Sequence, residues 1–536
     1  MKGKKLALGV SLMALLAFPV SQAAAQEAPK LTEDEWKAAK RIYFDRCAGC
    51  HGTLRKGATG PTLLPKRTKE LGTEALEVFI SEGTAGGMPA FVSGGMLSAQ
   101  EANLMARFIQ NDPVAPPEIS LADINETWKV IVPVDKRPSK PEHSRNWQNF
   151  FGVVLRDAGK VVIYDGDTKE NLGELPTGFA VHILRSSASG RYFYSIGRDG
   201  KATMIDLWSK TPTMVAEVKT CSEARSIETS KFHGYEDKLA IVGCYWPPHF
   251  VVIDGQTLEP KKIVSTRGYT YDTNEYHPEP RVAAIVPSHY SPEWVLNIKE
   301  TGFIWLVDYS NLRDMKIKMI EAERFLHDGG WDAKKRYFMP AANMKDTMVV
   351  IDTKTGKFVT KFKTGTKPHP GRGANWNDPK YGPVSGTVHL GEGRLAVWGS
   401  DPENKNKEFA KNAWKVVRSI ELKKGSGSLF MKTHPKSKNL WLDFTLNPEP
   451  SSHRSLCVMD ITKPEEEAKC FDVADHGRVV HMEYNKNGDE VWVAVWDKAG
   501  EIVVFDDKTL KEKTRFKNLV TPTGHFNVYN TMKDVY

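Results

Sequence analysis

The 536-residue sequence predicts a small all-α domain followed by an all-β, eight-bladed β-propeller. Helix caps and helical spacing lie before residue 112, whereas short apolar strands separated by Gly, Asp and Asn turns fill the chain from about residue 145. A proline-rich stretch connects the two parts and contains Pro113, Pro116, Pro117, Pro133, Pro138 and Pro141. We therefore expect the helical domain over residues 26–115, a linker over 116–144 and the propeller over 145–536.

The N-terminus has the pattern of a secretory signal peptide. Lys2, Lys4 and Lys5 precede an apolar run over residues 6–20, and the small residues 23–25 form an A-x-A cleavage site. The run is short for a membrane span, so we expect a signal peptide over residues 1–25, export to the periplasm and no membrane anchor. Cleavage would lower the formal net charge from +8 to +5, because it removes three lysines and no acidic residue.

The composition indicates a globular protein and excludes some classes of partner. Hydrophobic residues make up 40% of the chain and charged residues 26%, which is enough apolar material for a core. The chain shows no dense Lys/Arg patch with interleaved aromatic residues, so we expect no nucleic-acid partner. A mildly basic protein is compatible with small anionic ligands.

A haem-attachment motif follows the first predicted helix. Thr32-x-x-Glu35 forms a capping box, and the helix runs into Cys47-Ala48-Gly49-Cys50-His51. This C-x-x-C-H spacing allows two thiols to bond covalently to a haem while the histidine reaches the iron. A redox-active or zinc-binding Cys pair is the alternative, but export and a small helical domain favour haem c. We therefore expect a class I-like cytochrome c domain.

The second axial ligand of this haem is predicted to be a methionine. No histidine occurs between His51 and His143, and methionine ligation raises the potential for electron transfer. Met88 lies in a loop where glycines allow close backbone approach, and we favour it. Met96 is the alternative, but it lies two residues before the helix cap Ser98, so we interpret it as a packing residue.

Four further cysteines lie in the predicted propeller. Cys457 and Cys470 flank a turn and could face each other across a hairpin, and Cys221 and Cys244 form a second possible pair. Export permits disulfides, but paired and free buried thiols look alike in a sequence, so both pairings stay open.

The propeller prediction depends on a repeated strand that ends in aspartate. These aspartates lie 41 to 54 residues apart, with one interval of 108, and are Asp165, Asp206, Asp254, Asp308, Asp352, Asp460 and Asp506. Seven copies and one degenerate unit near residues 395–401 give eight units, with seven as the alternative count. Repeats of this length are typical of propeller blades, in contrast to an irregular series of β-sandwiches.

Histidine and arginine recur at one phase of this repeat. The position 24 to 29 residues before the strand-end aspartate is His182, Arg225, Arg281, His327 or His481, and His369 opens the degenerate unit. First strands line the central channel of a propeller, so residues at equal phase should meet at one end of its axis. Arginines around that end would bind carboxylates and attract anions, and histidines suit both ligation of iron and delivery of protons.

The mature chain closely resembles the cytochrome cd1 nitrite reductases over essentially its whole length. The shared stretches are Cys47-Ala48-Gly49-Cys50-His51, residues 177–182, the His-Asp-Gly-Gly-Trp-Asp segment over 327–332, the His-Pro-Gly-Arg-Gly-Ala-Asn segment over 369–375, residues 427–430 and residues 521–531. The resemblance implies a homodimer whose eight-bladed propeller holds haem d1. The implied reaction is the one-electron reduction of nitrite to nitric oxide.

The resemblance also implies roles for individual residues. His182 corresponds to the proximal ligand of the d1 iron, and His327 and His369 to the distal pair that protonates nitrite. The positions that correspond to binding of the d1 carboxylates and periphery are Arg156, Arg185, Arg198, Arg225, Tyr245 and Arg372, with Phe430, Thr523 and Gly524 as further pocket positions.

The sequence departs from the family pattern at two points. No tyrosine precedes Tyr43, so we do not expect a tail tyrosine to close over the d1 iron. His481 stands where some relatives have glutamine, and we hypothesise that it alters the pH profile.

Proteins with two other functions share this architecture. A dehydrogenase that completes haem d1 synthesis is one, and a non-catalytic carrier of haem d1 is the other. Retention of both His327 and His369 favours the reductase. For a reductase we expect a small c-type cytochrome or a cupredoxin as electron donor.

Overall fold

A computed structural model describes residues 27–57, 60–84 and 87–535. The predicted signal peptide therefore lies outside the described residues. The described residues form two compact units, one made of residues 27–39 and 63–113 and the other of residues 40–62 and 114–535. None of the helices in the described part of the chain has the length and hydropathy that a membrane span requires.

The first unit is helical. It contains most of α1(Glu33–Ile42), together with α3(Pro65–Glu82) and α4(Ala99–Phe108), and α3 packs against α4. Both predicted capping boxes are present, because Thr32 and Glu35 exchange backbone and side-chain hydrogen bonds and so do Ser98 and Glu101.

The second unit contains eight sheets of four or more strands, which confirms the predicted blade count. The first blade consists of β36(Pro522–Asn527), β2(Phe151–Leu155), β3(Lys160–Tyr164) and β4(Asn171–Pro176), and the second of β5(Val181–Ser186), β6(Tyr192–Gly197), β7(Lys201–Asp206) and β8(Thr213–Lys219). The third blade consists of β9(Glu223–Thr229), β10(Leu239–Trp246), β11(His249–Asp254) and β12(Pro260–Ser265), and the fourth of β15(Val282–Pro287), β16(Glu293–Ile298), β17(Phe303–Asp308) and β18(Ile317–Glu321).

The fifth blade consists of β19(Leu326–Trp331), β20(Tyr337–Ala342), β21(Thr347–Asp352) and β22(Lys357–Lys363). The sixth consists of β23(Pro368–His369), β25(Gly382–His389), β26(Arg394–Gly399) and β27(Val416–Glu421), and β24(Asn375–Asp378) also pairs with β25. The seventh consists of β28(Met431–Lys432), β29(Asn439–Leu442), β30(Ser455–Asp460) and β31(Lys469–Asp472), and the eighth of β32(Arg478–Tyr484), β33(Glu490–Trp496), β34(Gly500–Asp506) and β35(Glu512–Leu519). The middle strands are almost entirely buried, whereas fourth strands such as β22 and β4 are largely exposed.

Short elements connect and decorate the blades. They are β13(Gly268–Tyr269), β14(Tyr276–His277), η2(Val134–Lys136), η3(Trp147–Asn149), η4(Asn343–Lys345), α6(Lys407–Ala410), α7(Pro450–His453) and α8(Val528–Lys533). The stretch expected as a linker contains α5(Leu121–Thr127) and β1(Lys129–Val130). Helix α5 packs on β8 and β12, and β1 pairs with β8, so this stretch is attached to the second and third blades.

The repeated aspartates have a local structural reason. Each lies at the end of a third strand or directly after it, and six of the seven accept a hydrogen bond from the backbone N–H two residues later. The seventh, Asp506, accepts from Thr509 instead. An aspartate that caps its own turn in this way starts the connection to the fourth strand, which explains its recurrence in each repeat.

Both possible cysteine pairs in the propeller form disulfides. Cys221 is bonded to Cys244, and Cys457 to Cys470 in the expected hairpin position, where the two residues are direct partners across β30 and β31.

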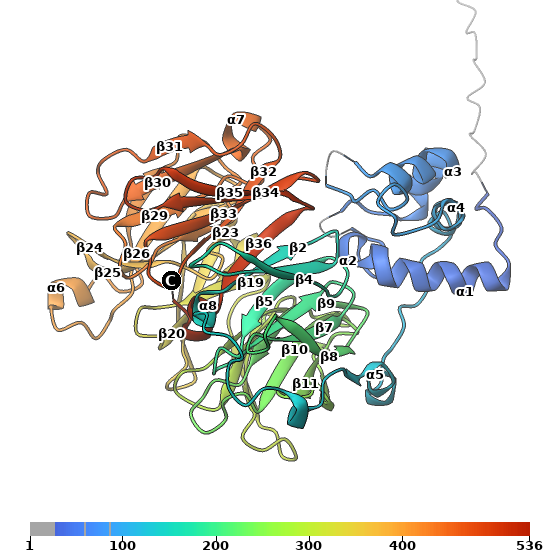
Figure 1. Ribbon diagram of the computed structural model, residues 1–536, viewed down its shortest axis with the longest axis horizontal. Coiled ribbons are helices and arrows are strands. Elements are labelled where there is room, and N and C mark those ends of the chain that lie inside the picture. Colours follow the sequence, from blue (N-terminus) through green and yellow to red (C-terminus); the bar gives the residue numbers. More distant parts are fainter. Residues whose placement is uncertain (1–26, 58–59, 85–86, 536) are drawn as a thin grey trace, which may run out of the picture. The chain divides into compact units, whose positions relative to one another are not determined.

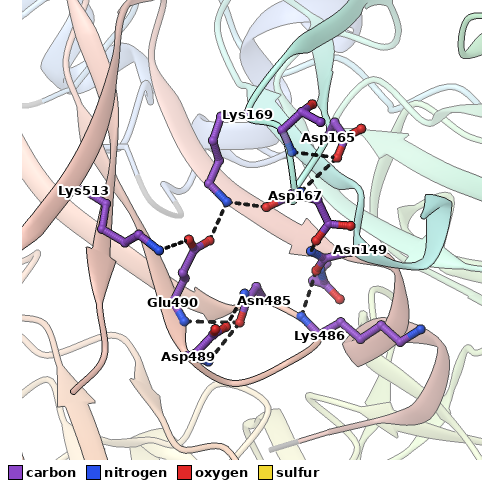
Figure 2. A network of polar contacts seen from close by, with 12 residues as sticks. Asn149, Asp165, Asp167, Lys169, Asn485, Lys486, Asp489, Glu490 and Lys513 are labelled. Carbon is purple, nitrogen blue, oxygen red and sulfur yellow. Dashed lines mark hydrogen bonds and ion pairs between the residues drawn. The ribbon is translucent and has the colours of Figure 1, made fainter. Parts of the chain in front are cut away.

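The last strand of the chain closes the ring. β36 pairs with β2, so the first blade combines residues from both ends of the propeller sequence (Figure 1). Figure 2 shows the polar contacts that join this blade to the eighth. Glu490 of β33 accepts from Lys169 Nζ of the first blade at 2.6 Å and from Lys513 Nζ of its own blade at 2.6 Å. Asn149 Oδ1 accepts from the backbone N–H of Lys486 at 2.9 Å.

The C-terminal segment is held by several blades at once. Lys231 Nζ donates to the carbonyl of Thr531, Lys335 to that of Lys533 and Lys432 to that of Val535, while His289 lies 3.1 Å from Asp534. Three of these residues, Lys231, His289 and Lys335, follow the ends of first strands. Because the first strands run in one direction around the ring, their starts lie at the opposite end of the axis, where the site is expected.

Removing the Glu490 carboxylate should weaken the closure of the ring. Its side chain is only 7% exposed and bonds two ammonium groups, so E490Q should lower the free energy of unfolding of the propeller by about 1–3 kcal/mol. Chemical denaturation monitored by tryptophan fluorescence measures this. The control E466Q removes an exposed partner of Lys463 and should cost at most about 0.5 kcal/mol. Equal effects of the two substitutions would contradict this role of Glu490.

Candidate functional site

The haem-attachment motif lies on two consecutive helical turns of the second unit. η1(Tyr43–Cys47) is a π-helical turn and α2(Ala48–His51) follows it, and Cys47 and Cys50 are the free cysteines among the described residues. His51 is buried, and its Nδ1 lies 2.8 Å from the carbonyl oxygen of Pro61. A carbonyl only accepts, so Nδ1 carries the hydrogen and Nε2 keeps the lone pair that iron requires. Burial also lowers the pKa of His51, which favours the neutral ligand form.

Both candidate methionines lie in the first unit. Met88 and Met96 are both half-buried and lie outside the helices and strands; the Met88 carbonyl accepts from Thr84 N, and Met96 N donates to the Phe91 carbonyl. They belong to the unit that does not contain His51, so the assignment of Met88 stays a prediction.

First strands of successive blades carry the predicted histidines near their starts. His182 is the second residue of β5, His327 the second of β19 and His369 the second of β23, while Arg225 is the third of β9. These strands pack on one another in series around the ring: β36 on β5, β5 on β9, β9 on β15, β15 on β19 and β19 on β23. The common phase therefore places these side chains at one end of the axis.

The environment of His182 shows that the cluster converges. Burial lowers the pKa of His182 well below its usual range, and the positive charges of Arg225 and Arg198 lower it further. Asp328 and His327 also act on this imidazole, although they lie more than 140 residues away in the chain. The result is a neutral imidazole with a lone pair, which is the form that binds a metal.

His327 and His369 lie on either side of one carboxylate. Asp328 Oδ1 is 3.3 Å from His327 Nδ1, Asp328 Oδ2 is 3.4 Å from His369 Nε2, and the ring centroids of the two histidines are 5.5 Å apart. His369 Nδ1 lies 2.6 Å from the carbonyl oxygen of Leu429, and Asn297 Nδ2 donates to the carbonyl of His327. The Leu429 contact orients the ring of His369, and the Asn297 hydrogen bond holds the backbone of His327.

The predicted arginines surround this group and share a few buried carboxylates. Arg185 and Arg372 both face Glu228 Oε2, at 3.4 and 3.1 Å. Arg198 pairs with Glu223, and its guanidinium lies 5.2 Å from the ring centroid of Tyr245. Arg156 is 3.6 Å from Asp157 and stacks over the Trp496 ring.

The donor set fits a cofactor that carries carboxylates. The guanidinium of half-buried Arg225 makes no hydrogen bond or ion pair within the described part of the chain, and Arg198 Nε is buried without an acceptor there. A buried guanidinium with unused donors is costly unless an anion completes it. Together with the neutral imidazole of His182, these groups suit an iron macrocycle with carboxylate substituents, as expected for haem d1.

Three further predicted residues lie on first strands or directly before one, and Phe430 precedes β28(Met431–Lys432). The Phe430 ring lies 5.9 Å from that of His369 and 4.9 Å from that of His481. Thr523 and Gly524 belong to β36, the first strand of the first blade. A Cβ added to Gly524 would lie 3.3 Å from the Phe526 ring, so this position has little room for a side chain.

The structure argues against the proposed titration of His481. This residue lies at a β-bulge of β32 with a φ of 59°, and its backbone N–H donates to Asp443. Burial lowers the pKa of His481 well below its usual range, and His525, Lys432 and Arg185 lower it further. The imidazole therefore stays neutral near pH 7, and the hypothesis that it shapes the pH profile loses its physical basis.

Three charged residues of this cluster received no role from the sequence pattern. Asp328 had a signal, since it directly follows His327 in a shared motif. Arg281 occurs at the predicted phase, and its guanidinium lies 5.2 Å from the Tyr245 ring centroid and 2.5 Å from Glu300. Lys299 follows β16 and fits no repeated pattern; burial and Arg281 lower its pKa to about 8.

Comparisons with known proteins agree with this arrangement. Residues 145–531 match the family described as "Cytochrome D1 heme domain", and residues 34–109 match "Cytochrome C oxidase, cbb3-type, subunit III". A nitrite reductase of Stutzerimonas stutzeri is 49% identical over 100% of this chain and 99% of its own length.

A second relative has a different activity. A dihydro-heme d1 dehydrogenase of Pseudomonas aeruginosa is 27% identical over 98% of this chain and 97% of its own length. The solved structure of dihydro-heme d1 dehydrogenase NirN in complex with DHE covers 92% of this chain and 100% of its own, with a TM-score of 0.72 and 26% identity. On the family match and on the full-length identity to a nitrite reductase, this chain belongs to the cytochrome d1 haem domain family and carries a cytochrome c domain at its N-terminal end.

Proposed function

We propose that this protein is a periplasmic nitrite reductase that converts nitrite to nitric oxide with electrons delivered through haem c. The observation that carries the proposal is the group of three imidazoles at the hub of the propeller. One of them, His182, is held neutral, and the other two, His327 and His369, share the Asp328 carboxylate. This separates a metal ligand from a proton-donating pair within one site.

The reaction requires protons as well as an electron. Nitrite, one electron and two protons give nitric oxide and water, and bound haem d1 would supply the iron at which nitrite is reduced. His182 would hold that iron through its free ring nitrogen. His327 and His369 would donate hydrogen bonds and then protons to the nitrite oxygen that leaves as water. The arginines would bind the carboxylates of haem d1 and draw nitrite into the hub.

The remaining parts of the proposal concern electron supply and assembly. Cys47 and Cys50 would attach haem c, with His51 and Met88 as axial ligands, so this haem would only carry electrons. We further propose a homodimer, a small c-type cytochrome or cupredoxin as donor, and export through residues 1–25.

The dehydrogenase is the second candidate, because a relative with that activity matches the chain over nearly its full length. Two features favour the reductase. The identity to the nitrite reductase is 49%, against 27% to the dehydrogenase. This chain also has both His327 and His369, and we expect a dehydrogenase to need only one of them. A carrier of haem d1 would need neither.

Substitution of the histidines separates these functions. H182A should lose haem d1, whereas H327A and H369A should retain it and lose about 10²–10⁴-fold in the rate of nitrite reduction. Optical spectra measure the d1 content, and nitric oxide production measures the rate. The control H233A removes a side chain that is 98% exposed and should change neither. Full activity of both distal variants would exclude the reductase mechanism.

Substitution of the methionines tests the haem c ligand. M88A should abolish methionine ligation and lower the reduction potential of haem c, because loss of the thioether destabilises the reduced iron. M96A should leave the potential unchanged. Spectroelectrochemical titration of each variant gives the potential, and the reverse pattern would assign Met96.

The neutral state of His481 leads to a prediction on pH. H481Q should leave the pH dependence of nitrite reduction unchanged, since neither side chain changes its charge near pH 7. Steady-state rates over the pH range of activity measure this, with H369Q as the variant that should change the curve. A displaced curve for H481Q would show that this imidazole titrates in the working protein.

A further inference from the structure

The Asp328 carboxylate lies between the two distal histidines in a way that constrains their hydrogens. His369 Nδ1 is 2.6 Å from the Leu429 carbonyl, and only a protonated nitrogen forms such a contact. The other nitrogen of this ring, Nε2, lies 3.4 Å from Asp328 Oδ2. A lone pair facing a carboxylate at this distance would be repelled, so Asp328 favours a hydrogen on Nε2 as well.

The second imidazole faces the same carboxylate. His327 Nδ1 lies 3.3 Å from Asp328 Oδ1, so the two oxygens of one side chain face one nitrogen of each ring. The carboxylate is ionised: burial would raise the pKa of Asp328, but His327, His369 and Arg225 together hold it well below its usual range.

The other groups around the pair oppose protonation. Burial lowers the pKa of His327 to about 3, and the charges of Arg225 and Lys299 act in the same direction. The nearby His182 is itself held neutral by burial and by Arg225 and Arg198. Among these groups only Asp328 favours the protonated form of His327. An arginine-rich pocket that attracts an anion would otherwise keep its proton donors uncharged.

We propose that Asp328 is a positioning residue that keeps a hydrogen on the facing nitrogen of both His327 and His369, so that nitrite meets a pair ready to donate protons. This inference rests on the proposed function, because it assigns the source of protonation of the same site. Nitrite has two acceptor oxygens, as the carboxylate does, and competes for the same N–H groups. The proton given to nitrite comes from a histidine, and Asp328 remains a carboxylate throughout.

The test is the pH dependence of nitrite binding to the oxidised full-length protein with both haems and no electron donor. The affinity is read from the absorbance of haem d1. D328N lacks the carboxylate that lies 3.3–3.4 Å from each imidazole. It should therefore lose its affinity for nitrite at a pH about one to three units lower than the parent protein does. Below that pH both proteins have protonated histidines, so the affinity of D328N should equal that of the parent or exceed it.

The pH-dependent loss of nitrite affinity that we expect for D328N differs from the effect of a structural defect, which would weaken binding equally at every pH. D328E keeps the charge and should restore most of the parent's pH dependence. D475N removes a surface carboxylate that lies 2.9 Å from His476 and should have no effect. An unchanged pH dependence in D328N, a uniform loss of affinity or loss of haem d1 from the variant would each overturn the proposal.

The binding measurement is independent of turnover. In one outcome, the parent protein loses nitrite affinity at a certain pH, D328N does so at a lower pH, and the parent produces no nitric oxide. The proposed reductase function then fails and the role of Asp328 stands. If the parent produces nitric oxide and D328N loses nitrite affinity at the same pH as the parent and retains its rate, the role of Asp328 fails and the reductase function stands.

Discussion

Eight first strands that run in the same direction around one axis bring residues 182, 225, 327 and 369 into a single poorly solvated space. The loss of water is the physical constraint on which the site depends. It removes the charge from His182, drives Lys299 toward neutrality and makes every unpaired guanidinium costly. A ring of arginines can persist there only if buried carboxylates such as Glu223 and Glu228, or an anionic ligand, balance it.

The same constraint explains why the two ends of the hub differ. At the C-terminal end of the first strands, lysines from three blades and His289 bind carbonyls and a carboxylate of residues 531–535, so the chain itself satisfies them. At the other end, the Arg225 guanidinium has no hydrogen bond or ion pair within the described residues, and the histidines face one another and one carboxylate. Ring closure through β36 and the Glu490 contacts fixes the spacing of the blades, and thereby the spacing of these side chains.

Local features of the sequence predicted most of the fold. The strand-end aspartates recur because each caps its own turn. Their spacing therefore predicted both the number of blades and the common position of His182, His327 and His369 within the repeat. The sequence did not predict the contacts between side chains of different blades, because these contacts depend on which side chains meet across the axis. The Asp328 bridge, the sharing of Glu228 by Arg185 and Arg372, and the stacking of Arg281 on Tyr245 are of this kind. The neutral state of His481 also depends on burial at a bulge that no repeat predicts.

A crystal structure of the full-length protein with both haems and bound nitrite is the most direct test of the geometry of the hub. We expect the His182 imidazole to bind the d1 iron and the nitrite oxygens to lie within hydrogen-bond distance of His327 and His369. We also expect the arginines around the hub to contact the d1 carboxylates. A structure in which another residue holds the iron, or in which nitrite lies away from both distal histidines, would contradict these expectations.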